Sequence, residues 1–281
     1  MEGSIIKKLL KFVFDIIRRS SKDSIGGHTA HAAFFVTVSF VPFIMLLIGM
    51  VRYIPVEEGL LIDHIVSVFP GGTKNMVSAF ITESYEKSGT ALVSITAITT
   101  LWAASIGVYS LVKGLNRVFC TDETRNFIIV RFMSMVYTLL LMALFIVCLI
   151  LFVFGDTITA WLSGFFPWIF EMALIIKAIK MIAGILVLSM IFLGMFVIIP
   201  NRKTKITTQI PGALVSSIGW IGFSYVFSYY IESAASFSYL YGSLSMIVLF
   251  MLWLFICIYI LYIGAEINKY IEDKIEHKTL F

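Results

Sequence analysis

Six long apolar stretches constrain this chain more than any other feature of its sequence. They cover about residues 30–54, 90–112, 132–154, 181–199, 210–231 and 243–265. Each holds the ~20 residues that cross ~30 Å of hydrocarbon as a helix. Backbone N–H and C=O groups find no water in lipid, so each stretch must satisfy them internally as an α-helix. The sequence therefore predicts an all-α polytopic membrane protein with six transmembrane helices.

The composition agrees with lipid as the main solvent. Of 281 residues, 59% are hydrophobic and 14% are charged, whereas soluble domains hold about 25% charged residues. The net charge of +4 is typical of loops that face anionic lipid, so it indicates no nucleic-acid partner. Cys120, Cys148 and Cys257 match neither a disulfide framework nor a metal or redox spacing, and we expect them to act as apolar filler.

Residues 1–22 differ from the six spans. Apolar residues recur there at helical spacing, and Lys and Arg side chains take the other face. This pattern predicts an amphipathic helix that lies in the lipid headgroup layer. A signal peptide is the competing interpretation, but Asp15, Arg18 and Arg19 interrupt or follow the apolar stretch too early for one.

The distribution of Lys and Arg predicts the orientation. In a six-span arrangement sixteen of them lie on the side of the two termini and five on the other. Since cytoplasmic loops carry the excess, we expect both termini in the cytoplasm. We accordingly divide the chain into an interfacial amphipathic helix (1–22), a six-helix transmembrane domain (23–270) and a cytoplasmic tail (271–281). Within the second part, an outer insertion at 56–88 is expected to form two short amphipathic helices, at 57–69 and 73–87.

Small residues predict where helices approach one another closely. Pairs spaced four apart, such as Ser110 with Gly114 and Gly212 with Ser216, occur on the second and fifth spans. We expect Pro211 to open the fifth span, where its missing N–H costs nothing. The second span is the most polar of the six, so it is the one we would choose to line a cavity.

Few side chains could carry chemistry. No HExxH, GxSxG or phosphate-binding motif occurs. His28 and His31 share a helix face near Asp23, where they are either polar anchors at the interface or a metal or proton-relay site. The spans lack mid-membrane ionisable residues, which argues against a proton-coupled pump or an ion filter.

Four residues form the candidate polar pocket. Asn116 and Arg117 lie at the inner end of the second span, and Glu266 and Asn268 lie at the inner end of the sixth. Two interpretations are open. The charged side chains extend to the headgroups, or Asn116, Arg117 and Glu266 meet on the cytoplasmic side as a polar pocket or inner gate, with Asn268 at the same edge.

An ordered set of short motifs runs along most of the chain. They are SFVP at 39–42, LWAAS at 101–105, LN at 115–116, IPN at 199–201, PGA at 211–213 before Trp220, YGSL at 241–244, LWL at 252–254 and GAEIN at 264–268. This ordered set resembles the YihY/BrkB family of bacterial inner-membrane proteins. The resemblance implies six spans in the bacterial cytoplasmic membrane. Family members have carried the label ribonuclease BN. We expect that label not to describe this chain, because its inner loops are short and RNA could not enter apolar spans.

Three functions follow from these features. The leading one is transport or translocation of a lipid or another amphiphilic envelope solute, with membrane lipids as partners and no cofactor. The alternatives are a scaffold or partner protein of the cell envelope, and an enzyme with the inherited ribonuclease label or a lipid-modifying activity. The sequence alone does not indicate an oligomeric state.

Overall fold

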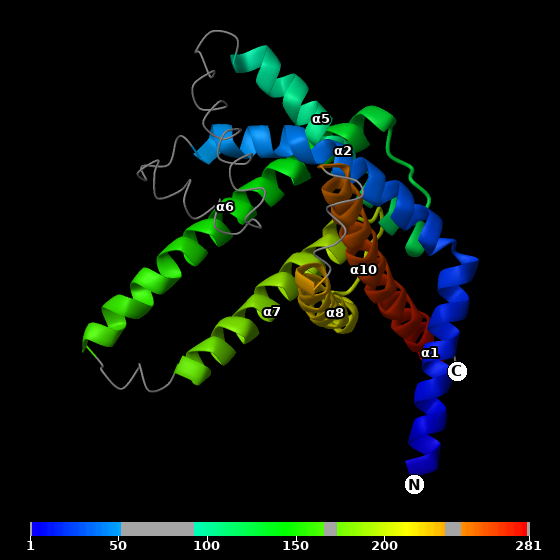
Figure 1. The fold of residues 1–281 in the computed structure, drawn as a ribbon. Coiled ribbons are helices and arrows are strands. Elements are labelled where there is room, and N and C mark those ends of the chain that lie inside the picture. Colours follow the sequence, from blue (N-terminus) through cyan, green and yellow to red (C-terminus); the bar gives the residue numbers. More distant parts are fainter. Residues whose placement is uncertain (1, 52–92, 166–172, 234–242, 280–281) are drawn as a thin grey trace. The chain divides into compact units, whose positions relative to one another are not determined.

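A computed structural model describes residues 2–51, 93–165, 173–233 and 243–279. The regular elements in these ranges are α-helices, labelled in Figure 1: α1 (Glu2–Lys22), α2 (Ile25–Val51), α5 (Val93–Val118), α6 (Phe127–Phe165), α7 (Ala173–Ile198), α8 (Ile206–Ser233) and α10 (Ser243–Thr279). All but α1 are long and apolar enough to cross a membrane, which makes six candidate spans among the described residues. The prediction of an all-α polytopic membrane protein is confirmed.

Each candidate spanning helix extends beyond its predicted apolar stretch at one end or both, and in two helices this changes an expectation. α8 begins at Ile206, so Pro211 lies inside the helix and not at its start, contrary to our expectation. α10 continues through the predicted tail to Thr279, and its candidate span is Ile247–Ile275. Hydropathy marks the apolar length of a helix, whereas backbone hydrogen bonding continues into polar residues. The predicted outer helices at 57–69 and 73–87 lie outside the described residues.

The chain divides into two compact units. The first contains Met1–Val38, Tyr109–Val130 and Lys177–Phe281, and the second contains Ser39–Val108 and Arg131–Ile176. α2, α5, α6 and α7 therefore contribute residues to both units. Each unit is described by its own contacts below.

In the second unit, α2, α5 and α6 share an apolar core. Leu47, Ala104 and Met142 are buried there, and partly buried side chains of α2 and α6 pack around them. Ser39 Oγ accepts a hydrogen bond of 2.8 Å from the backbone N–H of Gly107. Such a bond requires close contact between the α2 and α5 backbones. The small side chain of Ser39 and the missing side chain of Gly107 allow this contact.

In the first unit, α8 and α10 lie side by side, and α1 contacts the C-terminal end of α10 (Figure 1). Ile16 of α1 is buried with Ile267 and Tyr270 of α10. The ring of Phe12 meets the Tyr270 ring edge-on at 5.3 Å between centroids. Burial of these apolar side chains, at about 25 cal/mol per Å², is what holds α1 against α10.

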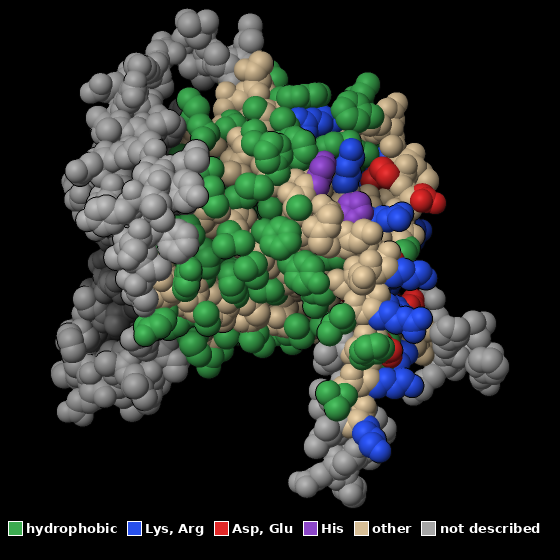
Figure 2. Space-filling view, turned by 45° about the vertical axis from the view of Figure 1, so that its right-hand side comes forward, with side chains coloured by type: hydrophobic (Ala, Val, Ile, Leu, Met, Phe, Trp, Pro, Cys, Tyr) green, Lys and Arg blue, Asp and Glu red, His purple; other side chains and the backbone are tan. Residues whose placement is uncertain are grey.

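The exposed side chains of α1, among those that the structure describes, are of two kinds. Leu10, Phe14 and Ile17 are exposed apolar side chains, and Lys and Arg side chains gather along the helix in Figure 2. A helix that presents apolar and basic strips next to each other is typical of the membrane interface. The structure thus agrees in its side-chain distribution with the amphipathic helix predicted for residues 1–22.

Candidate functional site

The polar residues of the first unit gather around the C-terminal half of α10. Asn268 binds the backbone of α8 on both sides of Pro211: its Oδ1 accepts from the Gly212 N–H at 2.7 Å, and its Nδ2 donates to the Gln209 carbonyl at 3.0 Å. Proline removes one helical donor and displaces the carbonyl four residues earlier. The fully buried Asn268 amide therefore pairs backbone groups next to this break, which is a structural role.

Glycines bring α8 and α10 into backbone contact beside Asn268. A Cβ atom added at Gly264 would lie 2.6 Å from the Gly212 carbonyl oxygen and closer still to Ser216 Oγ. A Cβ atom at Gly212 would lie 2.5 Å from Asn268 Cγ. Gly212 and Ser216, predicted from their spacing to mark a close contact, do face another helix, as does Gly114, which lies under Tyr262.

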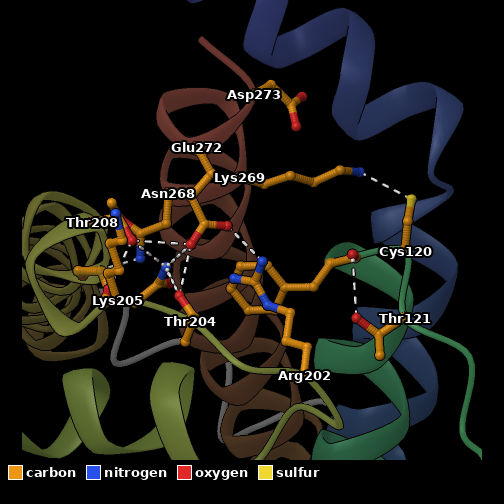
Figure 3. Close-up of polar contacts among 12 residues, drawn as sticks. Cys120, Thr121, Arg202, Thr204, Lys205, Thr208, Asn268, Lys269, Glu272 and Asp273 are labelled. Carbon is orange, nitrogen blue, oxygen red and sulfur yellow. Dashed lines mark hydrogen bonds and ion pairs between the residues drawn. The ribbon is translucent and has the colours of Figure 1, made fainter. Parts of the chain in front are cut away.

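Glu272, one turn beyond Asn268, is the centre of a second set of contacts (Figure 3). Its Oε1 accepts from Thr204 Oγ1 at 2.7 Å, Thr208 Oγ1 at 2.9 Å and Gln209 Nε2 at 2.6 Å. Its Oε2 pairs with Arg202, whose guanidinium lies 3.8 Å from the Phe119 ring centroid. Glu272 thus fixes the loop after α7 and the start of α8 against α10, and its lone pairs are in use.

Asn116 joins the two loops that follow α5 and α7. Its Oδ1 accepts from the Asn201 backbone N–H at 3.0 Å, and its Nδ2 donates to Glu123 Oε2 at 2.7 Å. Glu123 also pairs with Arg125 at 2.6 Å. The hydrogen bonds and charge of Arg125, with a smaller contribution from Asn116, lower the pKa of the Glu123 carboxyl despite its partial burial.

Two ion pairs connect α1 and the turn after it to α10. Arg19 Nη1 lies 2.6 Å from Asp273 Oδ2, and Lys269 Nζ lies 3.0 Å from Asp23 Oδ2. Lys269 also lies 3.0 Å from Cys120 Sγ, toward which it points in Figure 3. Burial lowers the pKa of Arg19, but Asp273 and the Glu266 charge raise it above its ordinary value.

Glu266 lies between these groups and differs from them. Its side chain has no exposed surface, and both carboxylate oxygens are buried without a hydrogen-bond partner. The nearest cation, Arg19 Nη1, is 3.9 Å from Oε1, too far for a hydrogen bond. Tyr262, one turn earlier on α10, also has a buried hydroxyl without a partner. A buried carboxylate with no donor is unusual and marks a candidate site.

We call Arg19, Asp23, Glu266, Lys269 and Asp273 the charged cluster. Its members come from α1, the turn that follows α1, and α10, and three of them lie within Ile247–Ile275, the sixth candidate span. Ionisable side chains within a spanning helix are costly and are commonly functional. The charged cluster extends from the interior to the surface, because the Glu266 side chain is 0% exposed whereas those of Arg19 and Asp273 are 33% and 41% exposed.

The structure does not join the four predicted pocket residues to one another. Asn116, Glu266 and Asn268 are buried in the first unit, whereas Arg117 is exposed. Within the described part of the chain, no hydrogen bond or ion pair connects any two of them. Asn116 and Asn268 bind backbone groups. Of the four predicted residues, only Glu266 has buried side-chain atoms without a hydrogen-bond partner. Elsewhere in this unit, Tyr262, Gln209 and Arg202 also have such atoms.

The two histidines stand apart from the charged cluster. His28 is half-buried and His31 is exposed, with its ring 4.7 Å from that of Phe35. Among the described residues there is no group of three side chains that could hold a metal ion. Both interpretations of the two histidines stay predictions.

Sequence reasoning missed most of the charged cluster. Arg19 entered only the orientation count and the argument against a signal peptide, Lys269 entered only the orientation count, and Asp273 was assigned to the predicted cytoplasmic tail. One signal could have found them: Glu266, Lys269 and Asp273 recur at helical spacing along one side of α10. Their partners on α1 are about 250 residues away in sequence, as the separation of 254 between Arg19 and Asp273 indicates, and no local pattern identifies them.

Similarity to known proteins covers nearly the whole chain. Residues 16–280 match the family model described as Virulence factor BrkB. The ribonuclease-like protein YfkH of Bacillus subtilis (strain 168) is 29% identical over 265 residues, which is 94% of this chain and 96% of that protein. A UPF0761 membrane protein of Vibrio vulnificus (strain YJ016) is 23% identical, covering 95% of this chain and 84% of the relative. No solved structure matches.

The family match includes the residues described above, from Ile16 on α1 to Asp273 on α10, and the Vibrio relative is named as a membrane protein. The family match and the six apolar helices together identify the class of molecule. The chain is a multi-pass integral membrane protein and belongs to the BrkB virulence factor family.

Proposed function

We propose that this protein moves an amphiphilic envelope molecule, a lipid or a solute with a lipid-like tail, across the bacterial cytoplasmic membrane. The polar part of that molecule would pass the charged cluster, while its apolar part stays in lipid. The proposal further has both termini in the cytoplasm, so that the charged cluster lies near the cytoplasmic surface.

One observation carries the proposal: Glu266 is fully buried in the sixth candidate span and makes no hydrogen bond. A side chain that served packing alone would not need a carboxylate there, because burying an unpaired charge costs several kcal/mol. The neighbouring polar residues Asn268 and Glu272 make the hydrogen bonds expected of structural groups. Glu266 is therefore the residue that we assign to function.

The arrangement of basic segments in the first unit supports the orientation. Lys269 of α10 contacts Cys120 after α5, and Arg202 before α8 pairs with Glu272 of α10. Arg19 near the end of α1 pairs with Asp273. These three segments contact a common stretch of α10, and together with the C-terminal part of α10 they carry the excess of Lys and Arg, as expected if all of them lie on the cytoplasmic side.

Transport can be tested with purified protein in liposomes that contain a fluorescent phospholipid. Chemical reduction of the fluorophore in the outer leaflet reports how fast lipid crosses from the inner leaflet. We expect the wild type to exceed empty liposomes and Glu266→Gln to reduce the rate at least tenfold. Asp122→Asn is the matched control, because it makes the same acid-to-amide change on an exposed loop side chain.

Rates equal to empty liposomes for all lipids and amphiphilic solutes tried would overturn transport. A partner that co-purifies in fixed ratio would then favour the scaffold function. The name of the Bacillus relative refers to ribonuclease, and incubation of the same pure protein with RNA tests that activity. We expect no cleavage above a mock purification.

Orientation has a separate test with periplasm-dependent reporter enzymes. A fusion after Ala235 should be active, and a fusion after Lys205, between α7 and α8, should be silent. The reverse pattern would place the termini in the periplasm and would reject this part of the proposal.

A further inference from the structure

The charged cluster contains one more carboxylate than it contains cations. The cations are Arg19 and Lys269, and the carboxylates are Asp23, Glu266 and Asp273. Each cation has a carboxylate at hydrogen-bond distance: Arg19 pairs with Asp273 at 2.6 Å, and Lys269 pairs with Asp23 at 3.0 Å. Glu266 is the carboxylate left over.

Glu266 is also the member of the charged cluster farthest from water. Asp273 and Asp23 have side chains that are 41% and 17% exposed, whereas that of Glu266 is 0% exposed. An excess negative charge would therefore rest at the position where solvation compensates it least. Some positive species must balance it.

The geometry decides which species this can be. Both Glu266 oxygens are buried without accessible surface, so neither a water molecule nor a metal ion has room beside them. A proton needs no volume. We propose that Glu266 is a proton-binding site, and that its loading and unloading gate the movement of the amphiphile. The link to movement rests on the function proposed above, whereas proton binding itself does not.

Arg19 provides the exchange that lets the proton leave. Its Nη1 is 2.6 Å from Asp273 Oδ2 and 3.9 Å from Glu266 Oε1, so a small rotation brings it to Glu266. Movement of Arg19 opens the Glu266 carboxyl to water from the exposed edge of the charged cluster, and the carboxyl O–H then breaks as its proton passes to that water. Arg19 then neutralises the Glu266 carboxylate, and Asp273, released by Arg19, is solvated. Proton uptake reverses each step.

Other titratable groups around Glu266 have different roles. On α10, Tyr262 lies one turn before it and its hydroxyl has no partner. Tyr270 lies one turn after it, within reach of Asp15 on α1 and Lys274 on α10. After α5, Cys120 contacts Lys269 and not Glu266. The charges that act on Glu266 are those of Lys269, Asp23, Arg19 and Asp273. Of these, Arg19 is the one that exchanges partners in the proposed mechanism.

Infrared difference spectroscopy of the whole protein in lipid nanodiscs tests this directly. A neutral buried carboxyl has a C=O stretch that is distinct from that of a carboxylate, and acid-to-alkaline difference spectra report its loss. We expect such a band in the wild type, its absence in the near-isosteric Glu266→Gln, and its retention in the control Asp122→Asn.

Two further variants test the exchange with opposite expected shifts. Arg19→Gln removes the cation that replaces the proton, so the band should persist to higher pH. Asp273→Asn frees Arg19 for Glu266, so the band should disappear at lower pH. Each midpoint should move by at least one pH unit, a tenfold change in proton affinity, about 1.4 kcal/mol.

The outcomes separate this inference from the proposed function. A wild-type spectrum identical to that of Glu266→Gln overturns proton binding, even if lipid transport is measured. A titrating Glu266 band without any transport overturns the proposed function but leaves the proton site standing. Equal midpoints in the Arg19 and Asp273 variants would reject the exchange while the band itself remains assigned.

Discussion

The contact between α8 and α10 gives the sharpest quantitative test of the structure. In Gly264→Ala, the new Cβ would lie 2.6 Å from the Gly212 carbonyl oxygen and 3.2 Å from Ser216 Cβ, with Ser216 Oγ nearer still. The first of these is a backbone atom and cannot rotate away, so the two helices must separate.

Separation has two costs. Overpacking a tight contact costs about 1–3 kcal/mol. Moving α8 away from α10 also weakens the two hydrogen bonds of Asn268 to the Gly212 N–H and the Gln209 carbonyl, at about 1 kcal/mol each. We therefore expect Gly264→Ala to lower the free energy of unfolding by roughly 3–5 kcal/mol, a large part of the about 5–15 kcal/mol typical of proteins.

Equilibrium unfolding of the purified protein in mixed detergent micelles measures this loss. Gly222→Ala on α8 is the matched control, because a Cβ there meets nothing within 4 Å, and it should change stability by less than about 1 kcal/mol. Adding Ser216→Gly to Gly264→Ala should recover part of the loss. A Gly264→Ala protein within about 0.5 kcal/mol of the wild type would refute the close contact.

Three further predictions concern the polar contacts. Glu272→Ala should destabilise the protein by about 3 kcal/mol in the same unfolding assay, because it leaves the largely buried Arg202 unpaired; a loss below 1 kcal/mol would contradict this. Asn116→Ala should cost about 1–3 kcal/mol by leaving a buried loop N–H without its acceptor, and wild-type stability would contradict it. Pairing with Arg125 lowers the pKa of Glu123. The contribution of the Glu123 carboxylate to the free energy of unfolding is therefore complete above the ordinary carboxyl pKa, and it is lost as pH falls through the lowered value. Glu123→Gln should therefore flatten the acid side of the stability curve, and parallel curves for the two proteins would be the contrary result.

Hydropathy alone predicted the fold class, because a spanning helix is a local property of about 20 consecutive residues. It predicted helix ends less well. α8 begins five residues before Pro211, and Asn268 on another helix pairs with the Gly212 N–H and the Gln209 carbonyl beside this proline. A compensation made by a distant residue leaves no trace in the local pattern.

The candidate site was partly predictable for the same reason. Glu266 and Asn268 drew attention as polar residues near the end of an apolar run. Their roles diverge because α8 offers unpaired backbone groups to Asn268 and nothing offers a donor to Glu266. Arg117 was expected beside them, but it lies on an exposed side of α5. The side of a helix that a neighbour will cover depends on tertiary packing.

The pairing of α1 with α10 has a consequence for biosynthesis. Arg19 leaves the ribosome early, and its partner Asp273 follows 254 residues later. At about 5–20 residues per second, that interval is roughly 13–50 s. During it, α1 lacks its contacts with Ile267, Tyr270 and Asp273. Insertion of the last helix then brings both ends of the polypeptide together, so a ribosome that stalls before α10 releases a chain whose amino terminus is still undocked and open to quality-control proteases.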